Sequence, residues 1–345
     1  MSEWKEYKLG EVLTFQRGYD LPKGDMMDGP YPVAGSNGII GYHAKYTTKG
    51  PGITIGRSGN IGMAHYYPID FWAHNTTLYV KDFKGNEPKF IYYLLKTIDF
   101  SLFNTGSAVP SLNRNHVHEL VVSIPPLDEQ KRIAGVLSSL DDKIDLLNRE
   151  NATLEALAET LFRHYFIENP DPTWKEGKLG VLINISSGKA LKRDEFVTNG
   201  LYPILGANGE IGRTHKYNVE EKDRVLYTGR VGTLGNVFRL DHEQAWLSDN
   251  TIVVMPKRYY NYVYFILKYA NLQDYNVGST QPLIRQSDIV DIDIVIPDND
   301  LLNSYENEVF LYFDKIKSNQ QQILTLTAYR DILLPRLMSG EVRIN

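Results

Sequence analysis

The feature that most constrains this chain is an internal repeat that runs through its whole length. The segment WKEYKLG at residues 4–10 returns as WKEGKLG at 174–180, and GRSGNIG at 56–62 returns as GRVGTLG at 229–235. Other segments match in the same order, at offsets that stay between 170 and 175 residues: YPVAGSNGIIG at 31–41 with YPILGANGEIG at 202–212, Asn75-Thr76 with Asn250-Thr251, and FIYYLLK at 90–96 with YVYFILK at 262–268. Chance does not preserve such an order, so the chain is a duplication of one structural unit.

The first part of each copy has the composition of a mixed α/β domain. Short β-prone runs, such as residues 77–80, 120–124 and 251–254, are separated by turns that contain glycine and asparagine. One helical segment interrupts the strands of each copy, near 87–99 and 259–271. We therefore expect two tandem-repeated domains, residues 1–126 and 169–298, each with a twisted β-sheet and helices.

The second part of each copy, residues 127–168 and 299–345, has a different pattern. Its apolar residues alternate in steps of four and three, which is the heptad of a coiled coil. Two amphipathic helices that each lie on their own domain are the alternative. Helices of about 35–38 residues, roughly 55 Å long, exceed the usual length of about 11–12 residues, and this favours a mutual coiled coil. The expected seam consists of Leu137, Leu140, Ile144, Leu147, Asn151 and Leu154 in the first helix, and of Val309, Ile316, Asn319, Ile323 and Leu326 in the second.

One asparagine in each seam predicts the orientation of the helix pair. Parallel pairing of the copies would place Asn151 and Asn319 against isoleucine or leucine. Antiparallel pairing would let the two amides face each other, and a single seam asparagine usually fixes register and orientation in this way. We therefore expect an antiparallel coiled coil with Asn151 near Asn319.

Charge and composition limit the class of protein without identifying it. The net charge is −5, but residues 1–125 hold 12 basic and 11 acidic side chains and residues 171–297 hold 15 of each, so the acidic excess lies in the two helical parts. This charge balance permits DNA binding without indicating it. Cysteine is absent, which excludes disulfides and is consistent with the cytoplasm. We expect neither an export signal at the N-terminus nor a membrane-spanning segment.

Three segments carry a resemblance to a known family. These are IPPLDEQKRI at residues 124–133, LLPRLMSGEV at 333–342 and the paired WKxxKLG openings; the segment PDNDL at 297–301 departs from the first of them. With these, the whole chain resembles the specificity subunits of type I restriction–modification systems. The resemblance implies two target recognition domains that each read one half of a bipartite, asymmetric site in double-stranded DNA. It also implies that the helices set the spacer and dock two adenine methyltransferase subunits, which restriction subunits then join.

The same resemblance implies a chain without a catalytic centre or cofactor of its own, and S-adenosylmethionine, ATP and Mg would belong to the partner subunits. The residues agree, because the glycines around residues 56–62 have neither the dinucleotide-binding nor the P-loop spacing. His116 and His118, two histidines without a cysteine nearby, are more typical of a surface than of a metal site. The alternative of a different class is a non-catalytic repeat protein with a structural or ligand-binding role.

The duplication also selects candidate DNA-binding residues. Two domains that read different bases should share the residues for fold and phosphate contact, and differ where they read bases. The glycine-rich loops are shared, and their glycines are expected to provide positive φ angles. Arg57 and Asn60, with their counterparts Arg230 and Thr233, are candidates for phosphate or groove contact; a structural ion pair is the alternative for the two arginines.

The loops at residues 108–116 and 280–288 differ between the copies within a shared frame. Asparagine, glutamine and arginine make bidentate contacts with base edges in the major groove. The predicted base-reading residues are Ser107, Asn113 and Arg114 in the first copy, and Ser279, Thr280, Gln281, Arg285 and Gln286 in the second. Ordinary solvated loop polarity is the alternative for each.

Overall fold

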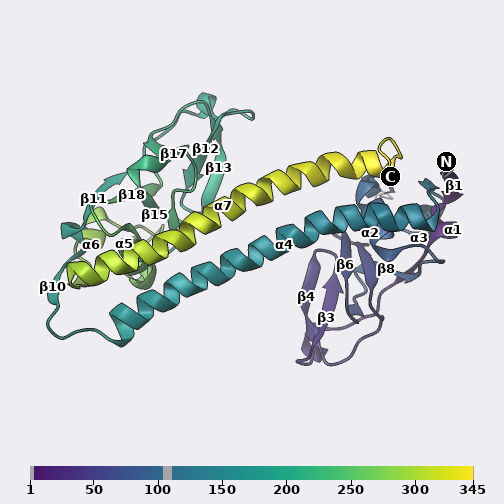
Figure 1. The fold of residues 1–345 in the computed structure, drawn as a ribbon, viewed down its shortest axis with the longest axis horizontal. Coiled ribbons are helices and arrows are strands. Elements are labelled where there is room, and N and C mark those ends of the chain that lie inside the picture. The colour runs from purple at the N-terminus through teal and green to yellow at the C-terminus, as the bar shows by residue number, and fades with distance from the viewer. Residues whose placement is uncertain (1–3, 104–110, 345) are drawn as a thin grey trace. The chain divides into compact units, whose positions relative to one another are not determined.

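The structure is a computed structural model that describes residues 4–103 and 111–344. The chain divides into two compact units. Unit 1 contains residues 1–146 and 322–345, and unit 2 contains residues 147–321. Each unit therefore holds one globular part and a portion of each of the two long helices, α4 (Leu127–Arg163) and α7 (Asn299–Met338), which are labelled in Figure 1.

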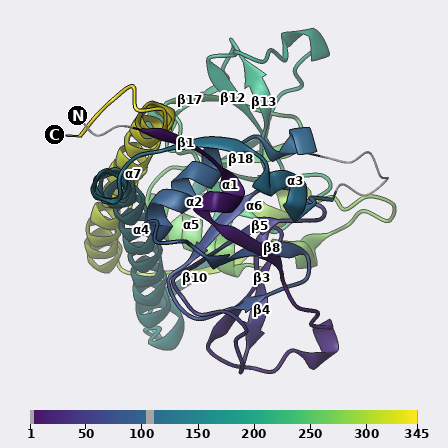
Figure 2. The ribbon, with the colours of Figure 1, turned by 90° about the vertical axis from the view of Figure 1, so that its right-hand side faces the viewer.

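The globular part of unit 1 is a mixed α/β domain. Two strands open and close it as an antiparallel pair, β1 with β9, and the other strands form the sheets β2-β8-β5-β6 and β4-β3-β7. Helices α1 and α3 lie next to each other (Figure 2). The bounds are β1 Lys5–Lys8, α1 Leu9–Val12, β2 Thr14–Arg17, β3 Tyr31–Gly35, β4 Gly38–His43, β5 Gly52–Gly56, β6 Ala64–Tyr67, β7 Trp72–Ala73, β8 Thr77–Asp82, α2 Pro88–Thr97, α3 Arg114–His118 and β9 Val121–Ile124.

Unit 2 repeats this arrangement. Strand β10 pairs with β19, and two four-stranded sheets have the orders β11-β18-β15-β16 and β13-β12-β17-β14. Helix α5 matches the helical segment that the sequence predicts near 259–271. The bounds are β10 Lys175–Lys178, β11 Ile183–Ser187, β12 Tyr202–Gly206, β13 Gly209–Thr214, β14 Val219–Glu220, β15 Leu226–Gly229, β16 Val237–Arg239, β17 Gln244–Leu247, β18 Thr251–Pro256, α5 Tyr260–Tyr269, α6 Gln286–Val290 and β19 Asp293–Ile296.

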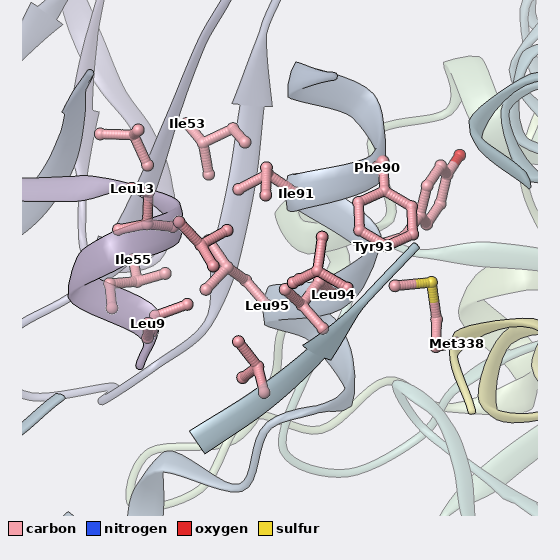
Figure 3. Packing of buried hydrophobic residues seen from close by; sticks show 14 of the residues in the cluster. Leu9, Leu13, Ile53, Ile55, Phe90, Ile91, Tyr93, Leu94, Leu95 and Met338 are labelled. Atoms are coloured by element: carbon pink, nitrogen blue, oxygen red, sulfur yellow. The ribbon is translucent and has the colours of Figure 1, made fainter. Parts of the chain in front are cut away.

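The core of unit 1 joins the sheet to both long helices. Side chains of α1, β5 and α2 pack together with Leu137 of α4 and with Leu337 and Met338 of α7. Figure 3 shows Met338 beside Tyr93 and Leu94 of α2. Because α2 presents an apolar face at helical spacing, it fills the space between the sheet and the long helices.

The core of unit 2 is built in the same way but is richer in aromatic rings. Phe162 of α4 is 1% exposed, and its ring lies 5.3 Å from that of Phe265 of α5 and 6.3 Å from that of Tyr305 of α7. Aromatic pairs at such distances contribute about 0.5–1.5 kcal/mol beyond the area that they bury. This one ring of α4 thus contacts both the domain, through α5, and the other long helix, α7.

Within unit 2 the two long helices run antiparallel and share a seam. The side chain of Asn319 donates a hydrogen bond to Asn151 Oδ1 at 2.8 Å, and Asn319 is fully buried. Lys315 pairs with Glu150 beside this contact, while Phe162, further along α4, lies near Tyr305, earlier on α7. The contact between Asn151 and Asn319, and the antiparallel orientation that it implies, are as the sequence predicts.

Within unit 1 the helix pair is held by a polar contact. Asp141 of α4 accepts hydrogen bonds from Arg330 of α7 at 2.9 Å and from Tyr93 Oη of α2 at 2.7 Å. The Asp141 and Arg330 side chains are 26% and 20% exposed. Burial and the nearby carboxylate raise the pKa of Tyr93.

All the expected seam residues in both helices are buried or half-buried. Among the described residues, no helix is long and apolar enough to cross a membrane.

Candidate nucleic-acid interface

Three segments of unit 1 meet at one edge of the sheet. The loop after β5 is held to the segment before α3, because Leu112 N–H donates to the Arg57 carbonyl at 2.9 Å and Ser58 forms a β-bridge with Ser111. The third segment is β2, which lies beside α3: Phe15 N–H donates to His118 Nε2 at 3.0 Å. The fold therefore brings the two predicted groups, around Arg57 and around Arg114, into one site.

Unit 2 holds the matching segments with the same backbone contacts. Ile284 N–H donates to the Arg230 carbonyl at 3.0 Å, and Val231 forms a β-bridge with Leu283. Arg57 and Arg230 N–H groups also donate, both at 2.8 Å, to the carbonyls of Thr76 and Asn250, the residues directly before β8 and β18. The frame of the site is thus the same in the two copies, as the repeated sequence predicts.

The glycines of these loops serve two different purposes. Gly59 and Gly62 have φ angles of +80° and +76°, which is the positive φ that the sequence predicts. The first glycine differs from that expectation, since Gly56 and its counterpart Gly229 do not have positive φ angles. A Cβ at Gly56 would stand 1.7 Å from the Asn60 carbonyl oxygen, and at Gly229 it would stand 2.0 Å from that of Thr233. These two positions need glycine because the loop closes on them.

The three segments of unit 1 enclose a groove of about 510 Å³. Three arginines line it, and none of its lining residues carries a carboxylate; the set is Arg17, Arg57, Leu78, Ser111, Leu112, Asn113 and Arg114. No ion pair joins Arg57 or Arg230 to a carboxylate within residues 4–103 and 111–344, so the alternative of a structural ion pair finds no support there. Three arginines, of which Arg17 has the exposed Asp20 3.7 Å away outside the lining, make a site that suits a polyanion.

Arg17 is a residue of this groove that the sequence analysis missed. It ends strand β2, and its side chain is 53% exposed, 3.7 Å from Asp20. The repeat contains the signal that could have found it. Arg17 precedes Gly18 as Ser187 precedes Gly188, so a shared glycine follows a position at which the two copies differ.

Part of the segment that was expected to be a loop is helical. Residues Arg114–His118 form α3, and the Asn113 side chain accepts a hydrogen bond from Asn115 N–H at 3.0 Å as the cap of this helix. A bidentate contact between asparagine and adenine needs the same carbonyl oxygen. The cap uses one of the two lone pairs of this oxygen and holds it against α3, and the role of Asn113 in base reading stays a prediction.

In unit 2 the corresponding helix is α6, and Arg285 stands at its cap position. Its backbone N–H donates to Asp288 at 3.0 Å, which leaves the exposed guanidinium outside the cap. The Gln286 side chain donates to Ser187 Oγ at 2.9 Å. Gln281 lies close to the glycine loop, since a Cβ at Gly232 would be 4.0 Å from its amide nitrogen.

The other predicted residues are exposed on the same two loops. These are Asn60 in unit 1, and Thr233, Ser279 and Thr280 in unit 2. Ser107 lies outside the described residues. Solvent exposure is compatible both with DNA contact and with ordinary loop polarity, so the role of these residues stays a prediction.

Helix α3 ends at a histidine, His118. Burial lowers the pKa of His118, and the positive charges of Arg114 and Lys84 lower it further. The neutral ring can accept the hydrogen bond from Phe15, against whose ring it is stacked at 6.0 Å. His116 is exposed on the same helix. No group of three potential metal ligands occurs among the described residues.

Comparisons with known proteins agree on one family. A sequence model described as "Type I restriction modification DNA specificity domain" matches residues 1–156 and 172–325. The MjaIX specificity subunit of a type I restriction enzyme from Methanocaldococcus jannaschii is 26% identical over 307 residues, 75% of this chain and 70% of that protein. A putative type I specificity subunit from Mycoplasma genitalium is 26% identical over 355 residues, 92% of this chain and 91% of the relative.

A solved structure has the same fold. The crystal structure of a type I restriction–modification S subunit from M. genitalium matches with a TM-score of 0.72 over 97% of this chain and 96% of that one, at 22% sequence identity. The likeness covers both copies of the repeat and both long helices, because almost all of each chain is matched.

Proposed function

Since the chain belongs to the family of type I restriction–modification DNA specificity subunits, we propose that each unit reads one half of a bipartite, asymmetric DNA site. The observation that carries this proposal is the groove of unit 1 together with the matching segments of unit 2. Both have the same backbone frame and a shared arginine, Arg57 or Arg230, while the neighbouring side chains differ. A shared cation suits the phosphate backbone, and variable polar side chains suit the bases.

The long helices have a separate role in this proposal. Two methyltransferase subunits dock on α4 and α7, restriction subunits join that complex, and the helix pair sets the spacer between the half-sites. Exposed apolar side chains on both helices, among them Leu157, Leu311 and Leu324, leave surface for such partners. The chain itself carries no catalytic step. S-adenosylmethionine, ATP and Mg are bound by the partner subunits, and the complex works in the cytoplasm.

The test is co-expression of the chain with a methyltransferase subunit of a type I system from the same genome, followed by sequencing of the methylated DNA. The proposal expects a bipartite motif. Exchanging residues 1–126 for those of a relative should change one half of that motif and leave the other half and the spacer unchanged. A motif that changes in both halves, or methylation that does not depend on this chain, would refute the proposal in favour of a purely structural repeat protein.

A second measurement separates phosphate contact from base reading. Arg57→Ala should weaken methylation at all sequences alike, and it should reduce the dependence of DNA binding on salt, because one phosphate contact is lost. Arg230→Ala is expected to do the same from unit 2. Altered base preference in either variant would contradict the assignment of these arginines to the phosphate backbone.

A further inference from the structure

Two positions of the repeat occupy the same place in both copies and carry different chemistry. In unit 1 they are Arg17 and Arg114, which line one groove. In unit 2 they are Ser187 and Gln286, which are joined by a hydrogen bond of 2.9 Å. The pairs correspond in sequence, at offsets of 170 and 172 residues. They also correspond in structure, because β2 lies beside α3 as β11 lies beside α6.

We propose that these two positions form the specificity pair of each unit, with Arg17 and Arg114 reading guanine in one half-site and Gln286, oriented by Ser187, reading adenine in the other. This proposal rests on the function proposed above and assigns a base preference to the same sites. It adds Arg17 and Ser187 to the predicted residues, and Asn113, whose carbonyl oxygen caps α3, is not one of the pair.

In unit 2 the assignment to adenine rests on the hydrogen-bonding groups of Gln286 that remain free. Gln286 uses one amide N–H for Ser187 and keeps its carbonyl oxygen and its second N–H. Adenine presents an acceptor and a donor in the major groove, which match these two groups in a bidentate contact. Because Ser187 fixes the side chain before DNA binds, less rotamer freedom is lost on binding.

In unit 1 the same space holds two guanidinium groups. Guanine presents two acceptors in the major groove, and a bidentate contact from arginine is the commonest way to read them. Arg57 lines the same groove and has a counterpart arginine in unit 2. Arg57 can therefore stay on the phosphate backbone while Arg17 and Arg114 turn toward the bases. The difference between the units is therefore a difference in base preference within one frame.

The experiment measures the methylation motif of the full chain in complex with its methyltransferase subunit, using plasmid libraries with randomised half-sites. The double variant Arg17→Ser/Arg114→Gln should lose its preference for a guanine in the half-site read by residues 1–126, by roughly five- to 150-fold in discrimination. The other half-site should not change. Lys81→Ser, which removes one exposed charge from β8, is the matched control and should leave the motif unaltered.

The reciprocal variant, Ser187→Arg/Gln286→Arg, should replace an adenine by a guanine in the other half-site. Ser187→Ala is a milder change, which should lower discrimination at that adenine while the complex still assembles and methylates. If the Ser187 hydroxyl only stabilised the fold, its removal would not change the base preference. Thermal melting of each variant verifies folding, and if a double variant does not fold, Ser187→Ala decides the test.

Three outcomes would overturn the specificity pair: an unaltered motif, a uniform loss at all sequences, which would assign Arg17 and Arg114 to phosphates, or a change in both half-sites. The proposed function fails in a different way. In that case the wild-type complex would give no bipartite motif, or exchange of residues 1–126 would not affect one half alone.

Discussion

The two units attach their domains to the long helices with opposite chemistry at equivalent positions. In unit 1, Tyr93 and Arg330 both bond to Asp141. At an offset of 172 residues the counterparts of Tyr93, Asp141 and Arg330 are Phe265, Phe313 and Ala158. Their rings and methyl group belong to the aromatic core of unit 2, where the guanidinium of Arg239 lies 3.5 Å from the centre of the Phe313 ring.

This contrast teaches that the three interface positions differ between the units as a matched set and not one residue at a time. Unit 1 has a polar trio that includes the cation Arg330 of α7, whereas unit 2 has an apolar trio, and the cation beside it, Arg239, stands on β16. A buried carboxylate next to phenylalanine would lack its partners and cost stability. Each domain therefore fits the helix residues of its own unit.

The largest expected effect tests the aromatic core. Phe162→Ala should lower the free energy of unfolding by about 3–5 kcal/mol, because a fully buried ring is lost and leaves a cavity. Its counterpart Leu334 is only half-buried, so Leu334→Ala should cost about 1–2 kcal/mol. Hydrogen exchange of peptides from each unit during denaturation measures both costs. Equal costs would refute the contrast between the two cores.

The polar trio should give the next largest effect. Asp141→Ala should cost about 2–3 kcal/mol, because the buried Tyr93 hydroxyl loses its acceptor and the half-buried Arg330 keeps only Asp331 of its two carboxylate partners. A double-mutant cycle with Arg330→Ala should give a coupling of about 1–2 kcal/mol, above the value for exposed pairs. Phe313→Ala/Ala158→Gly, the matched pair in unit 2, should show only packing losses without dependence on salt. A coupling near zero in unit 1 would show that the ion pair does not hold the helices.

The seam of unit 2 offers a smaller effect. Asn319→Leu should cost about 1 kcal/mol, because Asn151 loses its hydrogen-bond donor. The double variant Asn151→Leu/Asn319→Leu should recover that loss, since a buried polar pair can be replaced by apolar residues with little net cost. Their counterparts Ile323 and Leu147 are already apolar. If the double variant is less stable than the single one, the asparagines contribute stability beyond their mutual bond.

The smallest effect is a pH dependence of stability at His118, which only unit 1 should show. The pKa of His118 in the folded protein lies below its ordinary value, so the unfolded chain binds the proton more readily. The stability contributed by neutral His118 is present above pH of about 6.5 and decreases as the pH falls below that value. The counterpart Val290 does not titrate. Hydrogen exchange of β2 and α3 between pH 7.5 and 5.5 measures the effect, and His118→Gln should remove it.

The duplication allowed much of this fold to be predicted from the sequence. Matched glycines, heptads and openings established two α/β domains and an antiparallel helix pair, and the two seam asparagines predicted a specific contact. The sequence did not indicate that Asn113 caps a helix, because α3 has only five residues and no clear apolar period. Arg17 was missed for a similar reason. It is distant in sequence from the loops that line the groove, and only the pairing of β2 with β8 brings it there.

The division of the chain into units affects the order in which they can be completed during synthesis. Unit 2 is one continuous stretch, residues 147–321, whereas the core of unit 1 needs Leu337 and Met338 from the far end of α7. At the usual speed of a ribosome these two residues emerge on the order of ten seconds or more after Leu137. The nascent first domain therefore waits with an apolar side uncovered, and we expect chaperones to bind it during that interval.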